Sequence, residues 1–127
     1  MSQVPFHKNE QLIPLEPLPI VQRLVLAYKL WQEFLLHFPK ISRHTLGHKI
    51  DTLFIEIIDL ILRAHYLPQK EKTPCLREAS TKLDILKFFL QIAWEVKVLD
   101  NKKFIRLSEH LIEIGKMLGG WNRALSK

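Results

Sequence analysis

The stretch KLDILKFFLQIAW (82–94) decides the fold. Its apolar side chains recur with a helical period, and the pattern extends over about 75–99. On a helical wheel, only a narrow arc of this segment is polar: Arg77, Ser80, Asp84, Lys87, Gln91 and Glu95. A helix that is apolar over most of its circumference must be covered on more than one side. The stretch therefore predicts a subunit interface, or else a central helix shielded by the N-terminal arm.

Three more helical runs flank this segment, at about 20–37, 42–66 and 101–125. Pro39, Leu67-Pro68 and Asp100-Asn101 mark the breaks, and the polar stretch QKEKT (69–73) predicts a loop. An alternation of period two never lasts beyond a few residues, so strands are not expected. Four long helices with short connections predict an all-α protein, an antiparallel up-down-up-down four-helix bundle over 20–127.

Residues 1–19 form a separate segment. Pro5, Pro14, Pro17 and Pro19 interrupt it and forbid a continuous helix, so we expect a proline-rich extended arm. The chain has 127 residues, of which 47% are hydrophobic and 25% charged. This length and composition favour one globular domain with a single core and rule out wholesale disorder.

Several function classes do not fit the composition. The four glycines form no glycine-rich loop, which argues against a phosphate-cradling nucleotide site. No apolar run approaches the roughly 20 residues of a membrane span, and the start MSQVPFHKNE lacks the apolar core of an export signal. Cys75 is the only cysteine, so no internal disulfide can form. We therefore expect a cytoplasmic protein without membrane contact.

The positive charge is concentrated in the second half. The whole chain carries +6, and residues 68–127 hold twelve basic and seven acidic side chains, a net charge of +5. Such an asymmetry indicates a polyanionic partner, although solubilising charge is the alternative. The candidate phosphate-contacting residues are Arg77, Lys82, Lys87, Lys102, Lys103, Arg106, Lys116 and Arg123.

Catalytic and metal chemistry have weak candidates. His44 and His48 lie four residues apart on one helical face, a spacing that can hold zinc, but no further ligand stands at a suitable helical spacing. Lys40, Arg43 and Lys49 surround the pair, which favours a solvated or phosphate-facing role. Cys75 has no histidine near it in sequence to act as a base. The sequence therefore predicts no cofactor, no metal and no enzyme activity.

The segment IGKMLGGW (114–121) places three glycines in or near the end of a helix. Gly115 and Gly119 would allow the close approach of another backbone, or a glycine simply ends the helix. Trp121 would fold onto the bundle end or dock on a neighbouring subunit. The residues expected at an oligomer interface are Phe88, Phe89, Ile92, Trp94 and Trp121.

The segments KLDILKFFL (82–90), SEHLIEIG (108–115) and LGGW (118–121) resemble a family of small bacterial four-helix bundles. This family is typified by Avd, the accessory variability determinant of diversity-generating retroelements. It includes proteins encoded in intervening sequences of large-subunit ribosomal RNA genes. FPKISRHTLGHKIDTLFIEIIDLI (38–61) is similar to the family's second helix, and the resemblance covers about 20–125.

The resemblance implies a barrel-like homopentamer with a positively charged surface. Proteins of this type bind the retroelement's reverse transcriptase and its template RNA, or an RNA/DNA hybrid, and support mutagenic complementary-DNA synthesis. The family has no catalytic residues to carry over. Relatives of the ribosomal intervening-sequence type imply an alternative, a stand-alone bundle whose partner is a protein.

Overall fold

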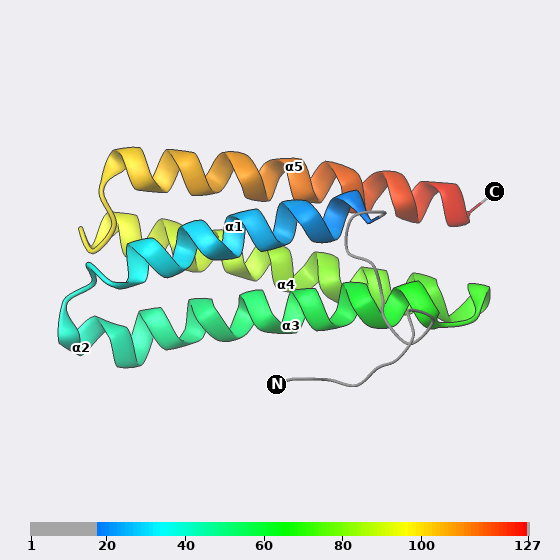
Figure 1. Cartoon of the computed structure of the whole chain (residues 1–127), viewed down its shortest axis with the longest axis horizontal. Helices are drawn as coiled ribbons and strands as arrows, with labels where there is room; N and C mark the ends of the chain where they lie inside the picture. Colours follow the sequence, from blue (N-terminus) through cyan, green and yellow to red (C-terminus); the bar gives the residue numbers. More distant parts are fainter. Residues whose placement is uncertain (1–17, 127) are drawn as a thin grey trace, which may run out of the picture.

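The computed structural model describes residues 18–126, so residues 1–17 of the expected arm lie outside it. The described chain is all-helical and contains no strand, with the order α1 (Pro19–Leu35), α2 (Lys40–Ser42), η2 (Arg43–Gly47), α3 (His48–Tyr66), α4 (Gln69–Glu95) and α5 (Asn101–Leu125). The four long helices form a four-helix bundle, as the sequence predicts (Figure 1). Each helix packs on two neighbours in the cyclic order α1, α3, α4, α5.

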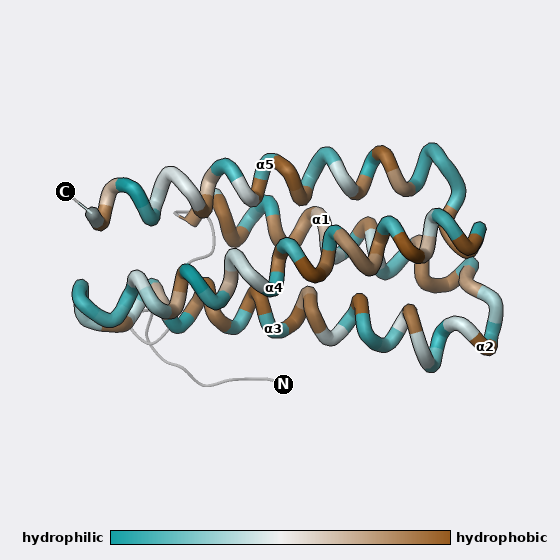
Figure 2. The backbone as a smooth tube through the Cα atoms, turned by 180° about the vertical axis from the view of Figure 1, so that it is seen from behind, coloured by the Kyte–Doolittle hydropathy of each residue, from teal (hydrophilic) through white to brown (hydrophobic). Residues whose placement is uncertain are grey.

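The core is formed by one apolar stripe from each long helix. Trp31 of α1, Phe54 of α3, Leu86 of α4 and Leu111 of α5 are fully buried. Among the described residues no polar or charged side chain is buried as a whole. Hydrophobic and hydrophilic residues alternate along each helix with the period of its turns, as Figure 2 shows.

The second predicted run is continuous but contains a π-helical turn. α2, η2 and α3 follow one another without a break from Lys40 to Tyr66. Gly47 ends η2 and is buried, and a Cβ atom there would lie 2.7 Å from Leu35 Cδ1. Glycine therefore lets the π turn pack against the end of α1.

The prediction for the start of the third helix was wrong. Residues 69–73 are not a loop but the first turns of α4, which begins at Gln69 directly after Pro68. Pro74 lies inside this helix instead of at its first position. Lys72 Nζ donates to the carbonyl oxygens of Ala64 and His65, at 2.7 and 3.1 Å. These bonds satisfy the carboxyl end of α3 and hold the first turns of α4 against it.

α4 also ends earlier than the expected residue 99. Lys97 has a φ of 67°, in the left-handed region, and the backbone N–H groups of Val98 and Leu99 both donate to Ala93 O. This closure stops the helix and turns the chain into α5. α5 and the predicted run 101–125 have the same bounds, and Asp100 caps α5 by accepting a hydrogen bond from Lys103 N at 2.9 Å.

Candidate nucleic-acid interface

The predicted phosphate-contacting residues do not share one face. Arg77 lines a small cavity between α4 and α5, and Lys87 and Arg123 border the glycines of α5 on the same side. Lys82 lies at the α3–α4 seam instead, where its Nζ is 3.2 Å from Glu56 Oε1. Lys116 is exposed on α5. The structure therefore brings only part of the predicted set together.

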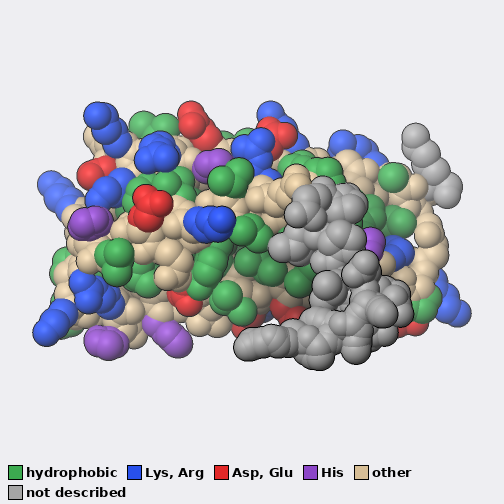
Figure 3. Space-filling view, viewed as in Figure 1, with side chains coloured by type: hydrophobic (Ala, Val, Ile, Leu, Met, Phe, Trp, Pro, Cys, Tyr) green, Lys and Arg blue, Asp and Glu red, His purple; other side chains and the backbone are tan. Residues whose placement is uncertain are grey.

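Three other members of that set gather near the start of α5. Lys102 and Arg106 are exposed, and Lys103 Nζ lies 5.7 Å from the ring centroid of Phe34, over the end of α1. The start of α5 is at the same end of the bundle as α2 (Figure 1). We call this end the α2 end, and Figure 3 shows Lys, Arg and His side chains gathered over it.

A second group of cations at the α2 end comes from the first half of the chain. Between Glu33 and Asp51 the sequence has no acidic residue. Six exposed basic or imidazole side chains lie within this interval. His37 is one of them, and the other five we call the α2-end cluster: Lys40, Arg43, His44, His48 and Lys49. The charge count by halves of the chain missed this group, because the acidic residues of the first half lie elsewhere. The acid-free interval is the signal that would have found it.

Three members of the α2-end cluster line a solvent-open hollow of about 380 Å³. Arg43, His44, His48 and Asp51 line it, together with Leu35 and Gly47. Arg43 is held in place by the end of α1, since its Nη2 donates to Leu36 O at 2.9 Å and its Nε donates to Phe38 O at 3.2 Å. The hollow therefore has a fixed guanidinium at its edge.

Asp51 is the one carboxylate that lines this hollow, and it is engaged by α1. Its Oδ1 accepts hydrogen bonds from Tyr28 Oη at 2.9 Å, Trp31 Nε1 at 3.1 Å and Gln32 Nε2 at 3.0 Å. Burial, and then the hydrogen bond to Asp51, raise the pKa of the Tyr28 phenol above its ordinary value of 10, as expected for a hydroxyl that donates to a carboxylate. Asp51 thus joins α1 to α3.

The predicted interface residues occupy three places. Phe88, Phe89 and Ile92 follow one another along α4, and Phe88 is 61% exposed. Lys49 Nζ lies 5.8 Å from the centroid of the Phe89 ring, which places this strip beside α3. We call Phe88, Phe89 and Ile92 the α4 apolar strip. Trp121 is half-buried near the opposite end of the bundle, on α5.

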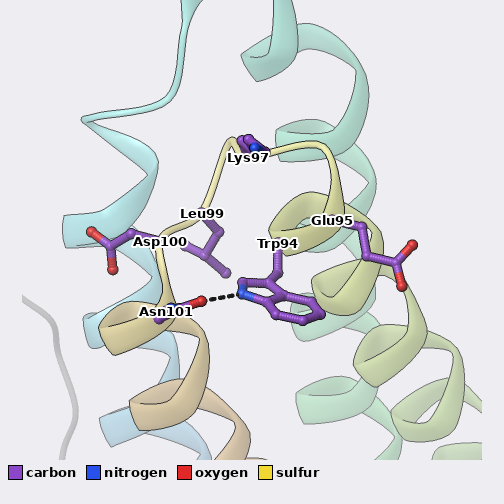
Figure 4. A pocket seen from close by; sticks show the side chains of 6 residues that line it. All are labelled: Trp94, Glu95, Lys97, Leu99, Asp100 and Asn101. Atoms are coloured by element: carbon purple, nitrogen blue, oxygen red, sulfur yellow. Dashed lines mark hydrogen bonds between the residues drawn. The ribbon is translucent and has the colours of Figure 1, made fainter.

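Trp94 belongs to a separate pocket at the turn between α4 and α5. Its indole stacks on Phe104, with ring centroids 5.1 Å apart, and its Nε1 donates to Asn101 Oδ1 at 2.5 Å (Figure 4). The pocket has a volume of about 630 Å³ and is lined by Trp94, Glu95, Lys97, Leu99, Asp100 and Asn101. With two carboxylates and one ammonium group, it is a poorer match for a polyanion than the α2-end cluster.

The residues considered for catalysis or metal binding, Cys75 and the pair His44 and His48, lie in different parts of the bundle. Burial, and then the charge of Glu78, raise the pKa of the Cys75 thiol, whose Sγ donates to Leu60 O at 3.2 Å. This is the opposite of an activated nucleophile. The described residues contain no group of three or more His, Cys, Asp or Glu side chains that could hold a metal, and His44 and His48 are a pair only. No helix in the described part is long and apolar enough to cross a membrane.

The comparison with protein families covers almost the whole bundle. A model of the family described as bAvd-like matches residues 19–125. The chain belongs to the bAvd-like family. The bAvd-like match begins at the first residue of α1 and ends at the last residue of α5, so all four long helices are included. A search of curated proteins found no match.

Proposed function

We propose that this bAvd-like protein is a non-catalytic accessory protein of a diversity-generating retroelement. In this role it binds the reverse transcriptase and the template RNA and supports mutagenic complementary-DNA synthesis. The observation that carries the proposal is the family match over residues 19–125. Its contribution is to gather and position macromolecules, so it requires surfaces instead of a catalytic centre.

The charge of the chain supports the RNA part of the proposal. The net charge of +6 and the cations at the α2 end suit contacts to the phosphates of RNA or an RNA/DNA hybrid. Contacts to phosphates hold a nucleic acid without reading its bases. The accessory role therefore requires no base-specific pocket.

Exposed apolar residues support an assembly of several copies. Phe88, in the α4 apolar strip, is 61% exposed. Ile85, on the preceding turn of α4, is 39% exposed. Contiguous apolar surface of this kind is typical of a protein–protein interface. The proposed assembly is a homopentamer in the cytoplasm, with Phe88, Phe89 and Ile92 at the contact between subunits.

Titration of a labelled structured RNA across a salt series tests the RNA part. The logarithm of the association constant should fall steeply between about 50 and 200 mM salt, with a slope of roughly −0.7 to −0.9 for each phosphate contacted. Light scattering on the protein, alone and with the reverse transcriptase added, tests the assembly. Affinity that does not change with salt, or a single-chain mass at high concentration, would contradict the respective part.

The alternative is a stand-alone bundle of the ribosomal intervening-sequence type, whose partner is a protein. The exposed α4 apolar strip favours it, because that strip would suit a foreign helix as well as a second copy. A reverse transcriptase gene and a repeat pair beside the gene for this chain would decide for the retroelement. Their absence, with no binding to RNA, would decide for the stand-alone bundle.

A further inference from the structure

We propose that the α2-end cluster is the primary contact surface for RNA, with a backbone phosphate seated in the hollow between Arg43, His44 and His48. This inference rests on the proposed RNA-binding function and names its site. It differs from the expectation that the second half of the chain provides the contacts. The basis is the position and pairing of the cations at the two ends of the bundle.

Three cations outside the α2-end cluster are paired with carboxylates. Arg63 Nε lies 2.8 Å from Asp59 Oδ2, Lys82 Nζ lies 3.2 Å from Glu56 Oε1, and Lys87 Nζ lies 3.8 Å from Asp84 Oδ1. None of these three pairs involves the α2-end cluster. Since a phosphate must displace any competing carboxylate, cations without an anionic neighbour bind it at lower cost.

Within the hollow, the guanidinium of Arg43 is held in one position by two hydrogen bonds. The bonds from Arg43 to the carbonyls of Leu36 and Phe38 fix its guanidinium, and its remaining N–H groups have no hydrogen-bond partner among the described residues. A planar guanidinium with free donors suits a phosphate. His44 and His48 line the same hollow, and a ring N–H of each can donate to a phosphate oxygen.

The carboxylate of Asp51 does not rule out an anion here. Three donors of α1 converge on its Oδ1, and they offset part of its negative charge. Lys40 and Lys49, both exposed, belong to the same continuous helical run as the cations of the hollow, and Lys102 and Lys103 lie at the start of α5, at the same end of the bundle (Figure 1). An extended RNA backbone would therefore find several cations in sequence at this end of the bundle.

Two triple variants of equal charge test the position of the surface. K40Q/H44Q/K49Q removes two ammonium groups and one imidazole from the α2 end, all of them exposed. R63Q/H65Q/K70Q removes two cations and one imidazole, also exposed, from the end where α3 meets α4. Because both variants have the same formal charge, any difference between them reports position and not net charge.

The probe is a labelled single-stranded oligouridine of about 20 nucleotides, measured by fluorescence anisotropy. At about 50 mM salt, K40Q/H44Q/K49Q should bind at least roughly 10-fold more weakly than the unmodified protein, and the salt slope should become shallower by about 1.5 to 2. R63Q/H65Q/K70Q should stay within about 3-fold of the unmodified protein. Circular dichroism spectra confirm that both variants are folded.

A double variant tests the two histidines separately from the lysines. The other charged groups at the hollow are Arg43 and Asp51, with the Tyr28 phenol of α1 behind Asp51. H44Q/H48Q should bind the oligouridine more weakly than the unmodified protein, because both imidazoles line the hollow. Inorganic phosphate at about 10 mM, at constant ionic strength, should displace little RNA, since a single phosphate makes fewer contacts than a chain.

The outcomes separate this inference from the proposed function. Strong, salt-dependent binding that both triple variants retain, or that both lose equally, would overturn the inference and leave the RNA-binding function intact. Complete displacement by inorganic phosphate would assign the hollow to a free anion and also overturn it. No binding by the unmodified protein would overturn both the proposed RNA-binding function and its location.

Discussion

Trp31 Nε1 of α1 donates a hydrogen bond to Asp51 Oδ1 of α3 across 3.1 Å. The Trp31 side chain is fully buried, so this indole N–H has no access to solvent. Tyr28 and Gln32 donate to the same oxygen, and the carboxylate therefore fixes the register between two helices. A carboxylate at a helix seam that satisfies a buried donor is expected to contribute more to stability than an exposed one.

Replacing Asp51 with alanine should destabilise the bundle by about 1 to 3 kcal/mol, because it leaves the Trp31 N–H buried and unpaired. Urea denaturation followed by circular dichroism measures the change. The matched control is D59A on the same helix, which removes the exposed salt bridge to Arg63 and should cost less than about 1 kcal/mol. An equal fall in the free energy of unfolding in both variants would show that the network at Asp51 stabilises the bundle no more than the exposed salt bridge does.

The network at Asp51 also shows how far the sequence alone could go. The helical period predicts which residues of α1 and α3 face the core, and Trp31 and Phe54 are buried as that period requires. It does not fix the sliding of one helix along another, so the meeting of Asp51 with Tyr28 and Gln32 was not predictable. The faces on which the predicted cations of α4 and α5 lie depend on the order of the helices around the bundle, which the period of a single helix does not give.

A contact between α3 and α4 explains the wrong boundary of α4. The stretch 69–73 is polar and precedes Pro74, a combination that normally indicates a loop followed by a helix start. Lys72 instead bonds the free carbonyls at the end of α3, an interaction between elements that the local sequence does not reveal. Propensity is a weak predictor where a tertiary contact supports a turn of helix.

Acid should weaken the bundle through His110. Burial, and then the charges of Arg23 and Arg106, lower the pKa of this imidazole below its ordinary value of 6.5. Because the unfolded chain takes up the proton first, the stabilisation from the neutral imidazole is present above about pH 6.5 and is lost as the pH falls through the folded pKa. The free energy of unfolding, measured in urea at about pH 8 and about pH 5, should therefore fall less in H110N than in the unmodified protein.

His65 offers the control for that measurement. It is exposed and lies at the end of α3, in contact with Tyr66, so H65N should leave the difference between the two pH values close to that of the unmodified protein. If H110N showed the same loss between about pH 8 and about pH 5 as the unmodified protein, the acid sensitivity would belong to other groups.

Gly119 should be replaceable within a single chain. It lies inside α5, and a Cβ atom there would meet only Arg123 Nη1, at the ordinary contact distance of 3.5 Å. G119A should therefore stabilise the isolated bundle by about 0.5 to 1 kcal/mol through helix propensity. G47A should stabilise less, because its Cβ would force Leu35 to move. Thermal unfolding measures both changes, and destabilisation by G119A would show that the added Cβ is not accommodated beside Arg123.

Phe88 should govern association without governing folding. Its side chain is 61% exposed, so F88S removes little buried surface from the single chain and should change the free energy of unfolding of the protomer by under about 0.5 kcal/mol. If the α4 apolar strip is covered by another copy, the same change removes an aromatic anchor of that contact. The average mass from light scattering should then fall toward that of one chain as the protein is diluted.

L26S is the matched control, since Leu26 is 55% exposed on α1, away from the strip. An equal loss of mass in L26S, or no loss in F88S, would place the subunit contact elsewhere.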